Sequence, residues 1–164
     1  MPSTKPTALP QRDVIAGWSL VLGQFALLGA LVLEAARSDS MALGSWSGAA
    51  LVTLAIAIVV AASLRLGSEL RTHPAPSDSA VLRTDGAYHF VRHPIYSGLL
   101  LLGVGLVVMA VTWLAAVEWV AMLALLTVKA RFEERLLTAR FPAYSDYARH
   151  TPRFMPRVGG RSGR

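Results

Sequence analysis

Gly86-Ala-Tyr-His-Phe-Val-Arg-His-Pro-Ile-Tyr-Ser-Gly98 is the most informative stretch of this sequence, and a long apolar run follows it directly. Its thirteen residues include two Tyr, two His, an Arg and a Pro, in a chain dominated by Leu, Ala and Val. A segment that only crosses a bilayer does not need these groups at its edge. The stretch therefore indicates half of a binding site. We expect the other half in Lys129-Ala-Arg-Phe-Glu-Glu-Arg-Leu-Leu137, where the apolar sequence ends.

The composition points to a membrane protein of one domain. The chain has 164 residues, of which 54% are apolar, and a length near 150 residues is typical of a single domain. It contains no Cys, so disulfides and thiolate metal sites are excluded. No His-x3-His pair lies on a predicted helix with a third ligand beside it, so we expect no metal site. The net charge of +6 is better explained by membrane orientation than by nucleic-acid binding.

Two apolar runs predict the first two membrane spans, at about residues 14–36 and 42–64. The first run contains one charged residue, Glu34, and the second contains none. Each is longer than the roughly 20 residues that a transmembrane helix needs.

The third apolar run is too long for one span. It comprises the 35 residues between His93 and Lys129, and one helix of that length would be roughly 52 Å long, against a hydrocarbon core of roughly 30 Å. We therefore expect a tight helical hairpin that turns near Val111-Thr112-Trp113, with spans at about 94–111 and 113–129. The indole of the last of these three residues then lies at the interface, where Trp is enriched.

The charge distribution predicts the orientation of these four spans. With an even number of spans both termini lie on one side, together with every basic residue except Arg37. The positive-inside rule makes that side cytoplasmic. We expect an all-α polytopic membrane protein with about four transmembrane helices and a C-terminal amphipathic cytoplasmic helix. Its single domain would cover residues 14–157, between disordered ends at 1–13 and 158–164. If the source is bacterial, the protein would lie in the cytoplasmic membrane.

The first half-site is predicted at the start of the third span. Pro94 suits the first helical position, because its fixed φ is helical and its missing N–H is not needed there. Arg92 and His93 then lie at the helix N-terminus and Tyr96 in the first turn, which together suit a bound carboxylate. The alternative interpretation is that these residues are interfacial anchors of a span.

The second half-site is predicted around Glu133-Glu134. Lys129 lies four residues before the first of these carboxylates, on the same helix face. Surface ion pairs worth tenths of a kcal/mol are the alternative interpretation. The hairpin, however, returns this segment to the side of the membrane that holds Arg92 and His93, so the acidic and basic groups can meet. Glu118, inside the fourth span, is a further candidate because membrane carboxylates are costly.

These motifs resemble a known enzyme family. The order Gly-x-Tyr-x-x-Val-Arg-His-Pro-x-Tyr-x-Gly, a helical hairpin, Glu-Glu-x-x-Leu-x-x-x-Phe-Pro-x-Tyr-x-x-Tyr and Arg-Phe-x-Pro is similar to that of the isoprenylcysteine carboxyl methyltransferases. The related phospholipid methyltransferases share the general pattern. The resemblance covers about Val81 to Pro156, nearly half of the chain.

The resemblance implies an integral membrane methyltransferase that uses S-adenosylmethionine as its cofactor. By position in the motifs, the residues expected to contact the cofactor are Val81, Leu82, Arg83, Tyr88, His93, Pro94, Ile95, Tyr96 and Glu133. The residues expected to contact the methyl acceptor are Lys129, Arg131 and Glu134, and the candidate catalytic residues are Arg92, Lys129 and Arg131. The acceptor would be lipophilic or small: an isoprenylcysteine-like carboxylate, an aminophospholipid or a thiol.

Two other functions compete with methyl transfer. Sterol reductases resemble this family in their C-terminal architecture, so an NADPH-dependent membrane reductase is one alternative. A non-catalytic membrane transporter subunit is the other. It would place polar residues opposite one another across several spans, for which the sequence offers Gln24 and Glu118. In all three cases the bilayer is the expected surrounding, and neither nucleic acid nor metal is an expected partner.

Overall fold

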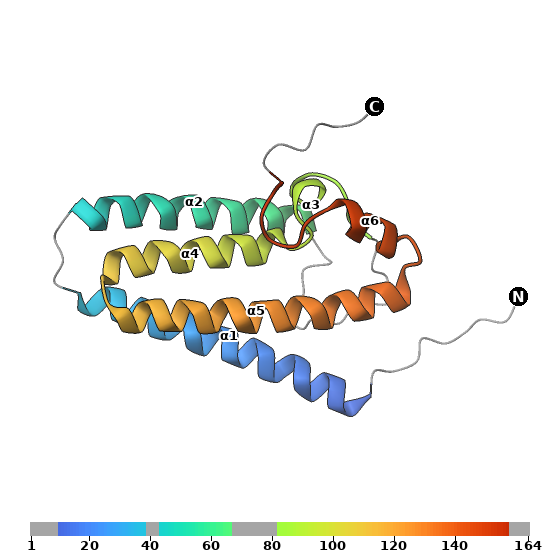
Figure 1. Cartoon of the computed structure of the whole chain (residues 1–164), viewed down its shortest axis with the longest axis horizontal. Coiled ribbons are helices and arrows are strands. Elements are labelled where there is room, and N and C mark those ends of the chain that lie inside the picture. Colours follow the sequence, from blue (N-terminus) through green and yellow to red (C-terminus); the bar gives the residue numbers. More distant parts are fainter. Residues whose placement is uncertain (1–9, 39–42, 67–81, 158–164) are drawn as a thin grey trace, which may run out of the picture.

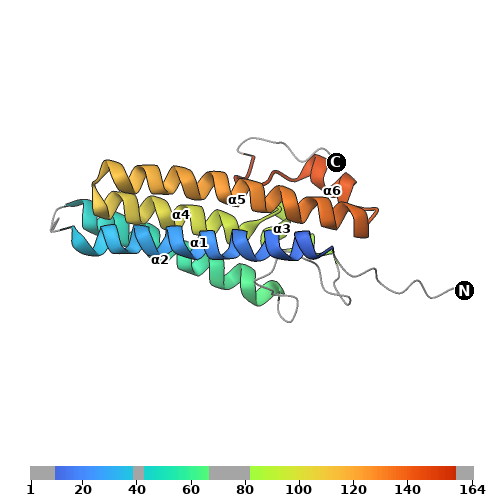
Figure 2. The ribbon, with the colours of Figure 1, turned by 90° about the horizontal axis from the view of Figure 1, so that it is seen from below.

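The computed structural model describes residues 10–38, 43–66 and 82–157, and the regular structure of these residues is helical throughout. Four long helices run side by side, and two short helices lie together at one end of the bundle (Figures 1 and 2). In chain order the helices are α1 (Gln11–Arg37), α2 (Leu43–Leu66), α3 (Ala87–Phe90), α4 (Pro94–Ala110), α5 (Trp113–Arg140) and α6 (Tyr144–His150). The all-α prediction is confirmed for these residues.

Three of the helices are long and apolar enough to cross a membrane, namely Gln11–Arg37, Trp46–Arg65 within α2, and Trp113–Arg140. Helix α4 is as apolar but has only 17 residues. Helix α5 continues well past the expected end of its span at residue 129, and its 28 residues correspond to about 42 Å. Helix α1 begins at Gln11, so residues 11–13, expected to be disordered, are helical. The remainder of the predicted disordered ends, 1–9 and 158–164, lies outside the described residues.

The hairpin between α4 and α5 turns at Val111 and Thr112, as predicted, although neither Gly nor Pro marks the turn. Val111 ends α4 with a φ of 53° in the left-handed region, which is rare for a β-branched residue. Thr112 is the N-cap of α5, and its side chain accepts a hydrogen bond from the backbone N–H of Ala115 at 3.1 Å. This Thr N-cap satisfies one of the free amides at the start of the helix.

Helix α4 is the centre of the bundle and contacts α1, α2 and α5. Two glycines let it approach α2 closely. A Cβ on Gly98 would lie 2.6 Å from Val59, and one on Gly105 would lie 2.9 Å from the carbonyl oxygen of Gly48. On the other side, the indole of Trp119 in α5 donates a hydrogen bond of 2.9 Å to the Leu100 carbonyl. Because α4 is held from three sides, its N-terminal end has a fixed position relative to α5.

The short helices and the segment after them close one end of the bundle. Helix α6 has seven residues, and its Tyr144 is 3% exposed. The hydroxyl of Tyr147 donates a hydrogen bond to the carbonyl of Tyr88, which joins α6 to α3. Beyond α6 the chain runs back to the start of α4, where the backbone N–H of Arg92 donates to the Pro152 carbonyl at 2.8 Å. This end of the bundle therefore combines α3, α6, the start of α4 and the later part of α5 (Figure 1).

Candidate active site

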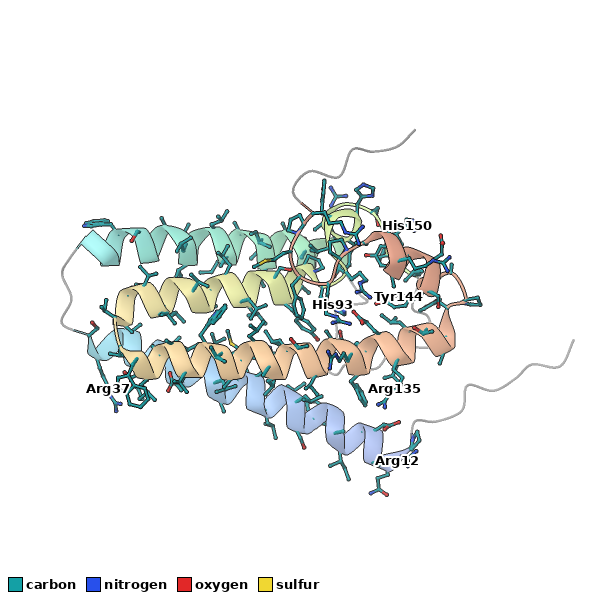
Figure 3. All side chains as sticks on the ribbon, viewed as in Figure 1. Arg12, Arg37, His93, Arg135, Tyr144 and His150 are labelled. Carbon is teal, nitrogen blue, oxygen red and sulfur yellow. The ribbon has the colours of Figure 1, made fainter. Side chains whose placement is uncertain are left out.

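The site is built on the N-terminus of α4. His93 is the N-cap residue and Pro94 is the first helical residue, as predicted, because a Pro at this position gives up no hydrogen bond. The amides of Ile95 and Tyr96 follow, and at these positions a helix offers no carbonyl partner. The side chain of His93 is buried and lies between α4 and α5 (Figure 3).

Both adjacent carboxylates of α5 meet the imidazole of His93. Its Nε2 lies 3.0 Å from Oε1 of Glu134, and its Nδ1 lies 3.4 Å from Oε2 of Glu133. Arg92 lies 3.1 Å from the same oxygen of Glu134 through its NH1. The predicted meeting of the two half-sites is therefore present, across forty residues of sequence.

Tyr96 connects the first turn of α4 to Glu133. Its hydroxyl donates a hydrogen bond of 2.6 Å to Oε1 of that carboxylate. Its ring is stacked on the imidazole of His93, with centroids 5.3 Å apart and planes within 5° of parallel. Glu133 is thus held from two directions, and its exposed fraction of 19% leaves part of it available to a ligand.

A second polar pair lies deeper, toward the middle of the bundle. Lys129 is 3% exposed, and its ammonium donates a hydrogen bond of 2.7 Å to Oε1 of Gln24 in α1. It also lies 5.1 Å from the centroid of the Tyr96 ring, a distance that allows a cation–π interaction. Next to Gln24, Gly23 lets α1 lie close to α5, because a Cβ there would lie 2.7 Å from the Leu125 side chain.

A cavity of about 480 Å³ joins these groups. Its polar lining comes from Gln24, Tyr88, Arg92, His93, Tyr96, Lys129 and Glu133, and its apolar lining from Phe25, Val59, Pro94, Ile95, Leu99 and Leu137. The volume is within the range of about 300–1,000 Å³ that small-molecule sites have. The charged groups come from α5 and from the residues just before α4, while α4 supplies half of the apolar lining residues and α1, α2 and α5 supply one each.

The pKa values of two of these groups, His93 and Tyr88, are both raised. Burial lowers the pKa of His93, but the hydrogen bonds and charges of Glu133 and Glu134 outweigh it, so that the net pKa is raised. Burial raises the pKa of Tyr88 to about 12, with further contributions from Glu133 and Tyr147. The imidazole is therefore stabilised in its protonated form, and the phenol in its neutral form.

Several expected site residues lie elsewhere. Val81 falls outside the described residues. Leu82 and Arg83 do not line the cavity, and Arg131 is exposed on α5 and does not line it either. Glu134 is also absent from the lining, because its carboxylate is bound by cations on its other side. Glu118, fifteen residues before Glu133 on α5, is about 22 Å away along the helix.

Two polar contributors, and the apolar lining residues Phe25, Val59, Leu99 and Leu137, were not assigned a site role from the sequence. Gln24 comes from α1, which the sequence predicts as an apolar span without a sign of a polar partner in α5. Arg153 comes from the segment after α6 and binds Glu134 through two hydrogen bonds, of 2.9 Å from Nε and 2.6 Å from NH2. The Arg-Phe-x-Pro motif was the available signal for the second residue. Within the described ranges, no group of three or more His, Cys, Asp or Glu side chains is placed to hold a metal ion.

Comparison with known proteins places this arrangement in a family. The isoprenylcysteine carboxyl methyltransferase (ICMT) family matches residues 48–139, which include α4, most of α5 and both halves of the site. The chain is also 33% identical, over 90% of its length, to the nickel-cobalt-cadmium resistance protein NccN of Alcaligenes xylosoxydans xylosoxydans. It is 32% identical, again over 90% of its length, to the cobalt-zinc-cadmium resistance protein CzcN of Cupriavidus metallidurans.

The chain spans 66% and 65% of the length of these two relatives. The similarity to them extends over nine tenths of this chain, well beyond the 92 residues that the family matches. The family match alone covers more than half of the chain. The apolar helices of the chain are of the kind expected of an integral membrane protein. The chain belongs to the isoprenylcysteine carboxyl methyltransferase family.

Proposed function

We propose that this protein is a membrane methyltransferase that uses S-adenosylmethionine and methylates a lipophilic or small acceptor. The observation that carries the proposal is the meeting of His93 and Tyr96 with Glu133 beside a cavity of about 480 Å³, in a chain of this family. His93 and Tyr96 come from the first of the two motifs that imply the cofactor, and Glu133 comes from the second.

The chemistry of the cavity fits S-adenosylmethionine. The carboxylate of Glu133 suits the ammonium of the methionyl group, while the start of α4 beside Arg92 suits its carboxylate. Phe25, Val59 and Leu99 line an apolar wall against which the less polar part of the molecule can pack. Tyr88, His93, Pro94, Ile95, Tyr96 and Glu133 are the residues proposed to hold it, and all of them line the cavity.

When bound, S-adenosylmethionine supplies a methyl group on a sulfonium for an in-line displacement. For such a reaction the chain has to align two molecules and exclude water. Tyr96 holds Glu133 in place from α4, and the buried imidazole of His93 fills the space behind the carboxylate. The apolar wall lowers the local dielectric, which strengthens each of these charge interactions.

We assign the acceptor end of the cavity to Lys129. Its buried ammonium faces the cavity from α5, whereas Arg131 is exposed and lies outside it. A lysine provides a compact charge in place of the planar fork of an arginine. An acceptor with one anionic or hydrogen-bond-accepting group next to its methylated atom suits this position. An isoprenylcysteine-like carboxylate, an aminophospholipid and a thiol all remain within the proposal.

We further propose that α1, α2, α4 and α5 all cross the membrane, as one domain over residues 14–157, with the site and both termini on the cytoplasmic side. The support is the charge pattern, since all basic residues except Arg37 then lie on one side. Arg37 ends α1 at the end of the bundle opposite His93 (Figure 3). Labelling of single introduced cysteines from outside the cell tests this: residue 39 should react and residue 143 should not. The natural chain has no cysteine to interfere.

Calorimetric titration of the detergent-purified protein with S-adenosylhomocysteine, the reaction product, tests the cofactor. We expect binding in the micromolar range that is lost in Glu133→Gln and retained in Glu118→Gln, which carries the same change at the far end of α5. Binding of NADPH in place of the product would favour the reductase alternative and overturn the proposal. A screen of prenylcysteines, aminophospholipids and small thiols with a labelled methyl donor would then identify the acceptor.

The two resistance proteins suggest a physiological setting. We propose that the methyltransferase contributes to resistance to divalent metal ions, because the similarity to both relatives includes α1 and the residues after the family match. The test is growth of a deletion strain on graded cadmium, cobalt, zinc and nickel, complemented with the wild-type chain or with Glu133→Gln. Complementation by both chains equally would show that methyl transfer is not what the resistance requires.

A further inference from the structure

Arg153 lies in the segment that follows α6, and its side chain binds Glu134 beside the site. Its guanidinium binds Glu134 as a fork, with Nε 2.9 Å from Oε1 and NH2 2.6 Å from Oε2. Such two-point contacts fix the plane of a carboxylate as well as its position. Glu134 is 12% exposed and Arg153 is 29% exposed, so the pair is shielded more than an ordinary surface ion pair.

The oxygen Oε1 of Glu134 is shared by three groups. It accepts from Nε of Arg153, lies 3.1 Å from NH1 of Arg92, and lies 3.0 Å from Nε2 of His93. The fork of Arg153, together with Arg92, therefore holds this oxygen beside the imidazole. The opposite edge of the imidazole faces Glu133, which lines the cavity.

We propose that Arg153 is a positioning residue of the donor site, which acts through Glu134 to orient His93 between the two carboxylates. The inference rests on the proposed function for its role in cofactor binding, but the contacts themselves do not depend on that function. Arg153 does not line the cavity, so it is not expected to touch the bound donor.

The segment that carries Arg153 is fastened to α4 by main-chain contacts. The backbone N–H of His93 donates to the Arg153 carbonyl at 3.1 Å, and the hydroxyl of Ser97 donates to the Phe154 carbonyl at 2.7 Å. The ring of Phe154 lies 6.1 Å from the imidazole of His93 and 6.5 Å from the ring of Tyr96, between centroids. These contacts keep the segment in place when the guanidinium is removed, so a substitution of Arg153 isolates the fork.

The charged and titratable groups around the imidazole come from every element that packs against it. Helix α5 contributes Glu133, Glu134 and Lys129, α4 contributes Tyr96, α3 contributes Tyr88, and the chain around α4 and after α6 contributes Arg92 and Arg153. The two carboxylates are the groups in direct contact with its nitrogens. If the fork is lost and Glu134 turns away, the imidazole loses one of these two anionic partners.

Loss of the Arg153 guanidinium can change the pKa of His93 in either direction, depending on whether Glu134 stays in place. Removing a positive charge near the imidazole raises its pKa if Glu134 stays in place, because the field becomes more negative. Releasing Glu134 lowers the pKa of His93, because the bond to Nε2 is weakened. A purely structural role for Arg153 would leave the pKa unchanged in the folded protein. The direction of the change therefore distinguishes the three cases.

The experiment is an NMR titration of histidine-labelled protein in detergent, for wild type, Arg153→Gln, Arg153→Lys and Arg149→Gln. The four His are few enough to assign by single substitutions. We expect the pKa of His93 to fall in Arg153→Gln, and to fall less in Arg153→Lys, which keeps one hydrogen bond. Arg149, 71% exposed and paired with Asp146, provides the matched control and should change nothing. An unchanged or raised pKa in Arg153→Gln overturns the inference.

Titration with S-adenosylhomocysteine gives the second measurement. We expect Arg153→Gln to bind it at least tenfold more weakly than wild type and Arg149→Gln to bind it equally well. If wild type does not bind, the proposed function fails, while the NMR titration still decides the role of Arg153. If Arg153→Gln does not fold, Arg153→Lys provides both measurements. Wild-type affinity in a folded Arg153→Gln would contradict the positioning role.

Discussion

The hydroxyl of Tyr96 lies 2.6 Å from Oε1 of Glu133 and joins the first turn of α4 to α5 across 37 residues of sequence. This contact is shorter than the contacts of Arg92 and His93 with the two carboxylates, which are 3.0 to 3.4 Å long. It depends on the hairpin, which turns at Val111 and returns α5 along α4. A single hydroxyl thus links the position of the Glu133 carboxylate to the packing of two helices.

The first prediction concerns this hydroxyl. Tyr96→Phe should weaken binding of S-adenosylhomocysteine by roughly tenfold or more, since a hydrogen bond to a charged group is worth about 1.5–3 kcal/mol. Calorimetry on the purified variant measures the change. Tyr147→Phe is the control, because the hydroxyl lost there bonds to the Tyr88 main chain and not to a carboxylate. Equal affinity of Tyr96→Phe and wild type would show that the hydrogen bond from Tyr96 to Glu133 does not contribute to binding.

Much of this site could be predicted from the sequence because its parts are local signals. Pro94 marks the start of α4, the 35-residue apolar run requires a turn, and the turn returns Glu133 to His93. Each step follows from a length or from a position along a helix. The exact residues of the turn also followed, although Val111 has a backbone conformation that its side chain disfavours.

Contacts between segments far apart in the chain could not be predicted in the same way. Gln24 and Lys129 are 105 residues apart, and their pairing depends on the rotation of α1 against α5 and on the space left by Gly23. The position of Arg131 outside the cavity could not be predicted for a similar reason. Residues 129 and 131 lie about 200° apart around a helix, so only one of them can face the cavity.

The second prediction concerns the Gln24–Lys129 pair. Gln24→Leu leaves a buried ammonium without its hydrogen-bond acceptor and should cost about 1–3 kcal/mol of unfolding free energy. Adding Lys129→Met to this variant should recover most of the loss, because two apolar groups then meet. Denaturant unfolding of the detergent-solubilised protein measures both. Additive losses in the double variant would contradict the pairing.

A third prediction follows from the turn between α4 and α5. Val111→Gly should stabilise the protein by up to about 1 kcal/mol, because glycine adopts a φ of 53° without the steric cost that valine pays. Val117→Gly, at an exposed position inside α5, is the opposite control and should cost about 1 kcal/mol. Thermal unfolding of both variants provides the comparison. A loss of stability in Val111→Gly would show that the turn does not strain the valine.

The contact between α2 and α4 gives the fourth prediction. A Cβ on Gly105 would meet the Gly48 carbonyl at 2.9 Å and Val52 at 2.9 Å, and backbone atoms cannot move aside as a flexible side chain does. Gly105→Ala should therefore cost about 1–3 kcal/mol, as overpacking does. Gly29→Ala in α1 meets nothing within 4 Å and should be neutral or slightly stabilising. Equal stability of the two variants would contradict the close approach of α2 and α4.

The last prediction is a pH dependence of stability that originates at His93. Burial alone would lower the pKa of this imidazole, but Glu133 and Glu134 raise it above the ordinary value of about 6.5. The folded protein therefore binds the proton more tightly than the unfolded chain does. Stability from this group is complete below about pH 6.5 and is lost as the pH rises through the folded pKa.

The measurement is the unfolding free energy between about pH 6 and pH 9, where wild type should become steadily less stable because of His93. His93→Gln removes the proton-binding group, so the slope due to this residue should disappear, although the variant is less stable at low pH. His150→Gln is the matched control, since the His150 side chain is 76% exposed at the end of α6. It should keep the wild-type slope. A slope that persists in His93→Gln would assign the pH dependence to another group and remove the evidence that the two carboxylates hold a protonated imidazole.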